Sequence, residues 1–217
     1  MTEEKIRLYG EPRWISPYVF SSFVALTEKD VPFEVVTVSL DDGENRRSEY
    51  RDRSITAKVP ALEHEGFCLA ESGAIAEYLE ESFPPPSHPR LFPEDLRARA
   101  RARQILHWIR SDLSALREER PTTSMFYARA TKSLSPAARA DAENLLRVTA
   151  LLLLPGATSL FGDWTLADSE LAFMLHRLLL NAHDVPPAIR AFAETQWKRP
   201  SVRTFVAHER PPAPPKS

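Results

Sequence analysis

In the first third of the chain, segments with the hydrophobic pattern of strands alternate with segments whose apolar residues have helical spacing. Ile6–Tyr9 and Phe33–Val38 are short runs rich in apolar and β-branched residues, which is typical of strands. Between them, the apolar residues of Val19–Leu26 recur at helical spacing. Ser16-Pro17 stands just before this run; serine is a good N-cap, and proline at the first helical position loses no hydrogen bond. The pattern therefore predicts a strand, a helix that begins at Ser16, and a second strand.

A hairpin and a further helix follow. Two short apolar segments, Ala61–His64 and Phe67–Leu69, flank Glu65-Gly66, a dipeptide that signals a tight turn between strands. Ser72 is then predicted to cap a helix, because the apolar residues after it recur at helical spacing. Residues 41–57 are polar and give no clear pattern. The order of strand, helix, strand, hairpin and helix predicts an α/β domain built on a small mixed sheet.

The rest of the chain carries only helical patterns. Apolar residues recur every four positions from Ile105 to Leu113, Ser135-Pro136 begins another helix, and Leu171–Leu179 and Ile189–Ala193 mark two more. No strand pattern competes with these repeats. The sequence therefore predicts an all-helical bundle.

Prolines mark the division between the two parts. Each proline lacks a backbone donor and clashes with the preceding turn, so the proline-rich segment 84–94 is predicted to be a linker. We therefore expect an α/β domain at residues 1–83 and an all-helical domain at residues 95–208. Residues 209–217, which are again rich in proline, are predicted to be a disordered tail.

Composition and charge narrow the class of protein. Hydrophobic residues make up 43% of the 217 residues and charged residues 27%, which is typical of globular proteins. The formal net charge of −2 argues against a nucleic-acid-binding domain, which would be basic. Cys68 is the one cysteine, so no internal disulfide is expected, and the histidines lack the spacing of metal ligands. No signal peptide or membrane-spanning run is recognisable, so we expect a cytoplasmic protein.

Ser16 is the first candidate for chemistry. A hydroxyl at the N-terminus of a helix lies among unpaired backbone donors and at the positive end of the helix dipole. A thiol placed there loses its proton more easily, because both effects stabilise the thiolate. The alternative is a plain N-cap, which the spacing alone favours.

Two further groups of residues have the chemistry to hold a peptide-like ligand. Lys58-Val59-Pro60 precedes a strand, and a cis bond at the proline would expose the backbone N–H and C=O of Val59; an ordinary trans proline is the alternative. Glu71 can pair with an ammonium group, and Ser72 at a helix start offers a hydroxyl and a backbone N–H to a carboxylate. For this pair the alternative is a plain cap with an acidic neighbour.

Thr165 and Asp168 are predicted to have a structural role. They have the spacing of a capping box, with aspartate in place of the usual glutamate. We expect them to stabilise the start of a buried helix.

Taken in order, these features resemble those of the cytosolic glutathione transferases, over almost the whole chain from Ile6 to Ala207. The shared features are a thioredoxin-like first half, an all-helical second half, Ser-Pro at the first helix, Val-Pro before a strand, and Glu-Ser at the next helix. Position 16 is serine, so the resemblance is to serine-type enzymes and not to the cysteine type. The stretches that look most like the bacterial YfcF-type transferases are Ser16–Val19, Ala74–Glu80, Arg99–Ile105, Arg110–Leu113 and Arg117–Pro121.

The resemblance implies a set of glutathione contacts. Ser16 matches the residue that hydrogen-bonds the glutathione sulfur. The backbone of Val59, before a cis Pro60, matches the contact to the cysteinyl part of glutathione. Glu71 and Ser72 match the pair that holds the γ-glutamyl group.

Further site residues are implied less directly. The resemblance implies a contact between Lys58 and the glycyl carboxylate, although the usual Asn-Pro before this lysine is absent. Trp14, Trp108 and Phe126 are expected to line a hydrophobic pocket for a second substrate.

The activity that the resemblance implies uses glutathione as co-substrate. The thiol would be conjugated to small hydrophobic electrophiles or would reduce peroxides. A homodimer is implied, and no metal, nucleic acid or membrane is expected as a partner. Two alternatives stay open: a glutathione-dependent isomerase or dehalogenase on the same scaffold, and a non-catalytic interaction module with the same fold.

Overall fold

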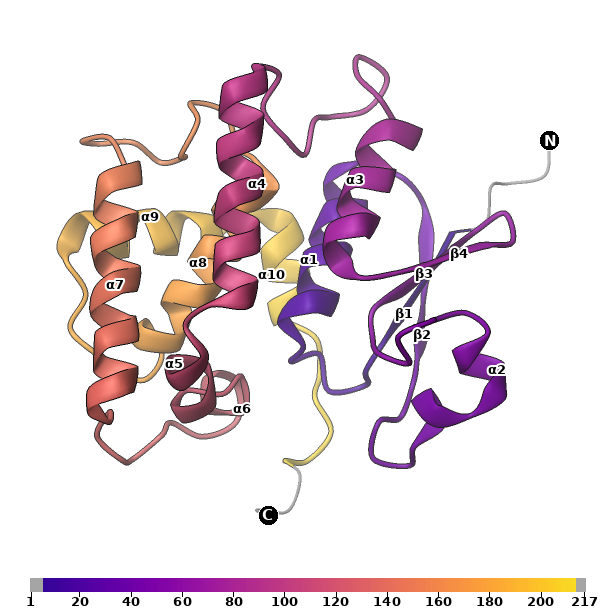
Figure 1. Ribbon diagram of the computed structural model, residues 1–217, viewed down its shortest axis with the longest axis horizontal. Coiled ribbons are helices and arrows are strands. Elements are labelled where there is room, and N and C mark those ends of the chain that lie inside the picture. Colours follow the sequence, from indigo (N-terminus) through magenta and orange to yellow (C-terminus); the bar gives the residue numbers. More distant parts are fainter. Residues whose placement is uncertain (1–5, 214–217) are drawn as a thin grey trace. The chain divides into compact units, whose positions relative to one another are not determined.

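The computed structural model describes residues 6–213, which divide into two compact units. The first unit contains the chain as far as Leu91 together with Ser201–Pro212, and the second contains Phe92–Pro200 (Figure 1). Part of the tail predicted at residues 209–217, namely 214–217, lies outside the described residues.

The first unit has a small mixed sheet flanked by helices. Its elements are β1 (Ile6–Gly10), α1 (Pro17–Glu28), β2 (Phe33–Thr37), η1 (Glu44–Arg46), α2 (Ser48–Arg51), β3 (Ala61–His64), β4 (Phe67–Ala70), α3 (Ser72–Ser82) and α10 (Pro200–Val206). The strand order is β2-β1-β3-β4, with β1 parallel to β2 and β3 antiparallel to β1 and β4. Helices α1 and α3 pack against each other on one side of the sheet (Figure 1). The α/β prediction for this part of the chain is confirmed.

The turn between β3 and β4 is the two-residue turn predicted at Glu65-Gly66. Glu65 has a φ of 51° and Gly66 a φ of 83°. Positive φ at both positions suits the right-handed twist of the two strands that the turn joins. The hairpin pairs Ala61 with Ala70, so the start of β3 lies beside the end of β4.

A buried lysine joins α1, α3 and the proline-rich segment that follows α3. The Lys29 side chain is 0% exposed, and its Nζ lies 2.5 Å from Oε2 of Glu80 and 2.9 Å from the carbonyl oxygen of Phe83. The same Glu80 oxygen accepts a hydrogen bond from the Leu91 N–H at 2.9 Å. A buried charge is tolerated when it is paired and hydrogen-bonded. The pair therefore fixes residues 83–91 to both helices.

The C-terminal segment packs on α1 through aromatic rings. The Trp14 ring is stacked on His208 at a centroid separation of 3.6 Å, and it meets Phe23 and Phe205 edge-on at 5.5 and 5.4 Å. Arg210 donates a hydrogen bond from Nη2 to the Trp14 carbonyl oxygen at 3.1 Å. These contacts anchor the segment that contains α10 to the first unit.

The second unit is built of helices around one central helix. Its elements are α4 (Leu96–Ser111), α5 (Ser114–Glu119), α6 (Thr123–Phe126), α7 (Pro136–Leu152), α8 (Leu166–Leu179) and α9 (Pro187–Trp197). Every residue of α8 from Leu166 to Leu178 is buried. Apolar side chains of α4, α5, α7 and α9 pack with those of α8 in one core. The prediction that this part is all-helical is confirmed.

Some local boundaries differ from the sequence patterns. The repeat from Ile105 to Leu113 predicts one helix, but Leu113 has a φ of 60° and separates α4 from α5. Ser72 is the first residue of α3 and not its N-cap, which is Glu71. The polar residues 41–57 contain η1 and α2. Hydrophobic period reports which face of an element is buried, and it carries little information on such bends.

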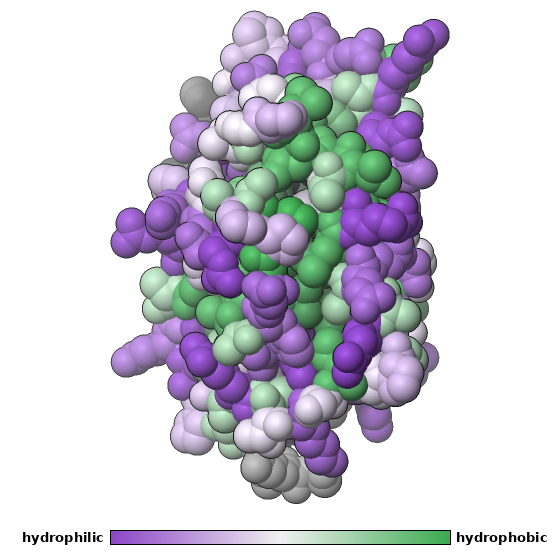
Figure 2. Space-filling view, turned by 90° about the vertical axis from the view of Figure 1, so that its left-hand side faces the viewer, coloured by the Kyte–Doolittle hydropathy of each residue, from purple (hydrophilic) through white to green (hydrophobic). Residues whose placement is uncertain are grey.

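Apolar side chains reach the surface of the second unit at the end of α7. Leu151 is 75% exposed and Leu154 is 72% exposed. Figure 2 shows the side of the molecule that carries α7, where an apolar band runs between charged residues. Across residues 6–213, no helix combines the length and the apolar character that crossing a membrane requires.

His176 is a buried histidine of α8 that stacks on Trp197 of α9. It is 3% exposed, and the two ring centroids are 3.8 Å apart. Its Nδ1 lies 2.8 Å from the carbonyl oxygen of Ala172. Burial lowers the pKa of His176 to about 4. The folded protein therefore keeps this ring neutral at pH values where the unfolded chain binds a proton.

We expect the free energy of unfolding to fall as the pH drops below the ordinary histidine pKa of about 6.5. Between about pH 6.5 and 4 the unfolded chain binds a proton at His176 that the folded protein does not bind, so acid favours unfolding. The loss from this one residue is about 2 kcal/mol between about pH 7.5 and pH 5. Urea unfolding at the two pH values measures it.

The matched control for this pH effect is the His176→Gln variant. Its free energy of unfolding is expected to depend less on pH than that of the wild type, by about 2 kcal/mol over the same interval. His183 and His208, whose pKa values burial also lowers, contribute equally to both proteins. An equal pH dependence in the two proteins would contradict the role given to His176.

Candidate functional site

Three of the predicted site segments meet at one end of the sheet in the first unit. Tyr9, near the end of β1, is opposite Ala61 at the start of β3, and Ala61 is opposite Ala70 at the end of β4. The segments attached to this end are the loop from β1 to Ser16, Val59-Pro60 before β3, and Glu71-Ser72 after β4. The strand register therefore brings these residues to the same edge of the unit.

Ser16 is the N-cap of α1, as its position before Pro17 predicts. Its Oγ accepts a hydrogen bond from the Val19 N–H at 3.3 Å, and Pro17 occupies the first helical position. A hydroxyl oxygen that accepts one hydrogen bond can still donate its own hydrogen. The half-buried Ser16 can therefore cap the helix and also donate to a ligand at the positive end of the helix dipole.

Glu11 holds the loop that leads to Ser16. Its Oε1 accepts hydrogen bonds from the N–H groups of Ile15 and Ser16, both at 2.8 Å, and its Oε2 accepts one from Arg13 at 2.7 Å. Glu11 is 7% exposed. Trp14, inside the same loop, has a backbone φ of 52°, a value that residues other than glycine seldom adopt. The carboxylate therefore satisfies three backbone donors in a tightly bent segment.

The loop before β3 is fixed through the backbone of Lys58. The Lys58 carbonyl oxygen accepts hydrogen bonds from Oη of Tyr50 at 2.7 Å and from Oγ of Ser54 at 2.9 Å. Burial raises the pKa of Tyr50 to about 12, so it remains a donor at neutral pH. The Val59–Pro60 bond that follows is cis. The Lys58 side chain is exposed.

Glu71 and Ser72 begin α3. Glu71 is exposed and has a φ of 72° and a ψ of 114°, a conformation that costs free energy for any residue other than glycine. Its carbonyl oxygen accepts the Ile75 N–H at 2.9 Å, so the helix starts directly after it. Ser72 is 3% exposed. The strained backbone turns the Glu71 side chain outward at the start of a helix.

The aromatic residues predicted to line a second-substrate pocket all pack against other side chains. Trp14 is 9% exposed within the aromatic cluster of the first unit, which leaves little of its ring for a substrate. Trp108 donates from Nε1 to Oδ2 of Asp112 at 3.0 Å and packs on the core of the second unit. The Phe126 ring lies 6.1 Å from that of Phe173. The pocket role of Trp14, Trp108 and Phe126 stays a prediction.

Thr165 and Asp168 form a capping box at the start of α8. Oδ2 of Asp168 accepts hydrogen bonds from the backbone N–H of Thr165 at 2.7 Å and from its Oγ1 at 2.8 Å. Oδ1 accepts the Leu160 N–H at 2.7 Å. Asp168 is 0% exposed, and burial raises its pKa. The carboxylate thus ties the preceding loop to the central helix.

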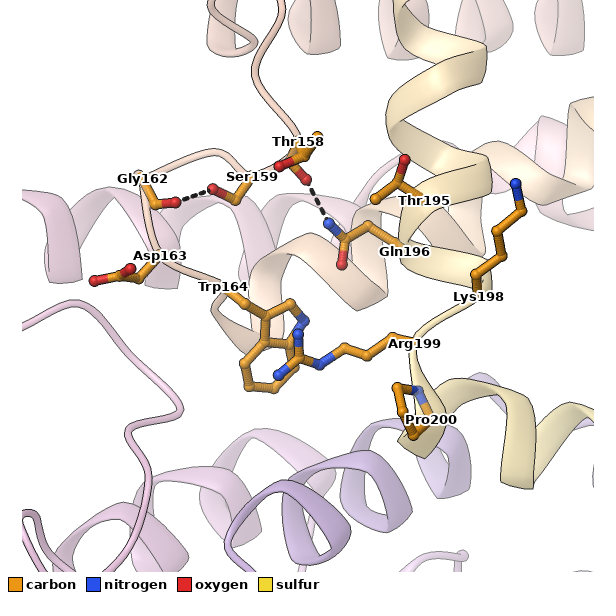
Figure 3. Close-up of a pocket in the computed structure, with 10 residues that line it drawn as sticks. All are labelled: Thr158, Ser159, Gly162, Asp163, Trp164, Thr195, Gln196, Lys198, Arg199 and Pro200. Atoms are coloured by element: carbon orange, nitrogen blue, oxygen red, sulfur yellow. Dashed lines mark hydrogen bonds between the residues drawn. The ribbon is translucent and has the colours of Figure 1, made fainter.

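A cavity of about 340 Å³ lies beside that loop within the second unit. Figure 3 shows its lining, in which Gln196 donates from Nε2 to the Thr158 carbonyl oxygen at 2.6 Å. The Arg199 guanidinium lies over the Trp164 ring, 4.1 Å from its centroid (Figure 3). These contacts hold the loop of the capping box against the end of α9.

The sequence patterns did not single out the residues that fix the loops of this site. Tyr50 and Ser54 fall in the polar segment without a pattern, and nothing in the spacing points to Lys58 as their acceptor. Glu11 offered a weak signal, because it is the only acidic residue in the segment 11–17 between a predicted strand and a predicted helix. These hydrogen bonds join residues two to eight positions apart across irregular backbone, which no periodic pattern marks.

Tyr9 and Cys68 lie on the sheet of the first unit and offer no activated group. Tyr9 is 6% exposed and donates from Oη to Oε2 of Glu63 at 2.5 Å. Burial raises the pKa of Tyr9 and also that of the Cys68 thiol. A raised thiol pKa disfavours the reactive thiolate. Within residues 6–213, no group of three or more His, Cys, Asp or Glu is arranged to hold a metal ion.

The chain matches two protein-family models. The model described as "Glutathione S-transferase, N-terminal domain" matches residues 4–81. The model described as "Glutathione S-transferase, C-terminal domain" matches residues 95–210. The two matches cover most of both compact units.

Among curated proteins, the similarity is confined to part of each chain. The probable maleylacetoacetate isomerase 2 of Drosophila melanogaster is 36% identical over 105 residues, which are 48% of this chain and 45% of that protein. Glutathione S-transferase theta-1 of Rattus norvegicus is 36% identical over 86 residues, which are 40% of this chain and 35% of that protein. The matched region spans less than half the length of these two relatives.

Solved structures match over nearly the full length. A glutathione transferase homologue from Burkholderia, with bound glutathione, is 37% identical with a TM-score of 0.77, covering 94% of this chain and 96% of that one. A bacterial maleyl pyruvate isomerase, described as a zeta-class glutathione S-transferase, is 25% identical with a TM-score of 0.71, covering 92% of this chain and 95% of that one.

Proposed function

Because the chain belongs to the glutathione S-transferase family, we propose that it activates the thiol of glutathione for conjugation to small electrophiles or for the reduction of peroxides. The observation that carries this proposal is the register of the sheet, which gathers Ser16, Val59 and Glu71-Ser72 at one end of the first unit. Glutathione needs partners for its thiol, its peptide groups and its γ-glutamyl end, and these residues supply each kind.

The proposed roles follow from the chemistry of each group. The Ser16 hydroxyl donates a hydrogen bond to the glutathione sulfur, and the N-terminal end of α1 adds a favourable electrostatic potential. The backbone of Val59 pairs with the cysteinyl peptide groups. Glu71 pairs with the γ-glutamyl ammonium, Ser72 binds its carboxylate, and the exposed Lys58 binds the glycyl carboxylate.

The reaction itself takes place on the sulfur. In conjugation, the thiolate forms a bond to an electrophilic carbon, and the leaving group departs with its electron pair. In peroxide reduction, the sulfur takes the terminal oxygen, an alcohol is released, and a second glutathione then yields glutathione disulfide and water. The protein lowers the free energy required to form the thiolate and orients the sulfur, and both effects raise the rate of the two reactions.

The binding part of the proposal is tested by calorimetric titration with glutathione. Replacing Glu71 with alanine removes the partner of the ammonium group, and a charged hydrogen bond of this kind is worth about 1.5–3 kcal/mol. We therefore expect the Kd for glutathione to rise by about 10- to 100-fold. The matched control is Glu81→Ala, which removes an exposed glutamate at the other end of α3. Absence of binding by the wild type would overturn the proposal.

An isomerase is the second candidate function. Curated relatives include maleylacetoacetate isomerases, and one solved relative is a maleyl pyruvate isomerase. In such a reaction glutathione adds to a double bond and is then released, so none is consumed. Steady-state assays with chlorodinitrobenzene, cumene hydroperoxide and a maleyl compound distinguish the possibilities. Turnover of the maleyl compound alone, without loss of thiol, would favour the isomerase.

A non-catalytic interaction module and the assembly state need separate tests. Failure to bind immobilised glutathione would favour the module.

We propose a homodimer in the cytoplasm, as the resemblance implies. Light scattering is then expected to give about twice the chain mass of 24.6 kDa, and the mass of a single chain would contradict the dimer.

A further inference from the structure

A buried carboxylate lies at the centre of the loop that carries Ser16, and the proposed mechanism gives it no role. Glu11 is 7% exposed and accepts three backbone hydrogen bonds of 2.7 to 2.8 Å. Two of them come to the same oxygen, Oε1, from Ile15 and from Ser16 itself. The residue proposed to touch the sulfur is therefore held by its own backbone N–H.

Several backbone N–H groups near the start of α1 donate hydrogen bonds within this loop. The N–H groups of Ile15 and Ser16 donate to Glu11, and the N–H of Val19 donates to Oγ of Ser16. Pro17 has no N–H. The backbone N–H groups at positions 15, 16 and 19 are therefore engaged within the protein, and position 17 has none. The hydroxyl hydrogen of Ser16 can still be donated outward.

We propose that Glu11 is a positioning residue for thiol activation: it occupies the backbone donors of Arg13, Ile15 and Ser16 and so orients Ser16 with its hydroxyl toward the sulfur. This inference rests on the proposed function. It assigns Glu11 an effect through Ser16 and no contact with the substrate.

The arrangement has an electrostatic consequence. Two hydrogen bonds of about 3 Å, one at the Ser16 N–H and one at its Oγ, place a sulfur bound to the hydroxyl within roughly 9 Å of the Glu11 carboxylate. A negative charge at that distance in a partly buried site opposes the formation of a thiolate. Glu11 therefore favours the geometry of activation and disfavours its charge. The two effects separate when the charge is removed without changing the shape of the side chain.

The experiment compares Glu11→Gln with Glu11→Ala in steady-state kinetics over a range of pH. Glutamine keeps an oxygen for Ile15 and Ser16 and loses only the acceptor for the Arg13 N–H, so its kcat at high pH is expected to stay within about threefold of the wild type. The midpoint of the profile of kcat/KM for the electrophile, measured with glutathione saturating, is expected to move down by about 0.5 to 1 pH unit. Alanine loses the acceptor, so its kcat is expected to fall by about tenfold or more, with a smaller change in the Kd for glutathione.

Amide hydrogen exchange gives a readout that does not depend on turnover. The amides of Ile15 and Ser16 are expected to exchange faster in Glu11→Ala than in the wild type. Glu119→Ala is the matched control, because Glu119 also accepts a backbone N–H, that of Ser135 at 2.9 Å, in the second unit. It is expected to leave the kinetics and both amides unchanged.

The outcomes separate this inference from the function on which it rests. A wild type without glutathione-dependent activity overturns both. An active wild type whose Glu11 variants keep its rate, its pH midpoint and its amide protection overturns the role of Glu11 alone. A fall in rate for both variants with no shift in the midpoint would mean that Glu11 only supports the fold, which also overturns the inference.

Discussion

Replacing Ser16 with alanine is expected to lower kcat by about 100-fold, or roughly 2.7 kcal/mol of transition-state stabilisation. Loss of a single donor aimed at a reacting anion has effects of this size in other enzymes. The Kd for glutathione is expected to change by less than about threefold, because the γ-glutamyl and cysteinyl contacts at Glu71-Ser72 and Val59 remain. Steady-state kinetics combined with calorimetric titration measures the two quantities.

The chain provides a matched control for the loss of the helix cap. Ser135 caps α7 as Ser16 caps α1: its Oγ accepts the Ala138 N–H at 3.2 Å, and Pro136 occupies the first helical position. Ser135→Ala and Ser16→Ala are both expected to lower the free energy of unfolding by about 1 kcal/mol. Only the change at Ser16 is expected to lower kcat. Equal kcat values for the two variants would reduce Ser16 to a plain cap.

Replacing Lys29 with alanine is expected to lower the free energy of unfolding by about 3 to 5 kcal/mol. The substitution leaves Glu80, whose side chain is 14% exposed, without its cation, and it also removes the donor to the Phe83 carbonyl oxygen. An unpaired charge in such a place costs far more than an exposed ion pair contributes. Urea unfolding at neutral pH measures the loss.

Two further variants test the cause of this loss. Removing both charges in Lys29→Met with Glu80→Leu is expected to restore part of the stability, because the uncompensated carboxylate is then absent. Arg190→Ala is the matched control, since Arg190 and Glu194 form a pair whose side chains are 43% and 49% exposed. It is expected to cost less than about 0.5 kcal/mol. A loss of that small size for Lys29→Ala would contradict the account of the buried pair.

The elements that hydrophobic period governs were predictable from the sequence. The strands at Ile6 and Phe33, the helix that begins after Ser16 and the hairpin turn at Glu65-Gly66 all appear where the patterns place them. These features depend on local backbone propensity and on burial of one face of each element. A few adjacent residues determine both.

A helix break and a buried charge are two features that the sequence patterns did not predict. Leu113 belongs to an unbroken apolar repeat, yet its φ of 60° ends the helix there. Lys29 directly follows α1, where a lysine is ordinarily exposed. Here its ammonium group is buried and contacts Glu80 and the carbonyl oxygen of Phe83. Charged side chains are seldom buried without such partners, and a sequence pattern does not reveal the partners.

The candidate site also contains both residues that the sequence indicated and a residue that it did not. Ser16, Val59-Pro60 and Glu71-Ser72 were singled out because a helix start or a proline marks each of them. Glu11 was missed, because its role comes from accepting the N–H groups of Ile15 and Ser16 rather than from any motif. The sequence offers only a weak signal for Glu11, the one acidic residue of segment 11–17, and its hydrogen bonds become visible in the structure.

The central claim is that Ser16 stabilises the thiolate of bound glutathione, and the pKa of that thiol tests it most directly. Titration of the thiolate absorbance of the glutathione complex across the pH range gives this pKa for the wild type and for Ser16→Ala. The account predicts a wild-type pKa below the ordinary thiol value of about 8.5, and a pKa higher by about one to two units in Ser16→Ala. The same pKa in both complexes would contradict it.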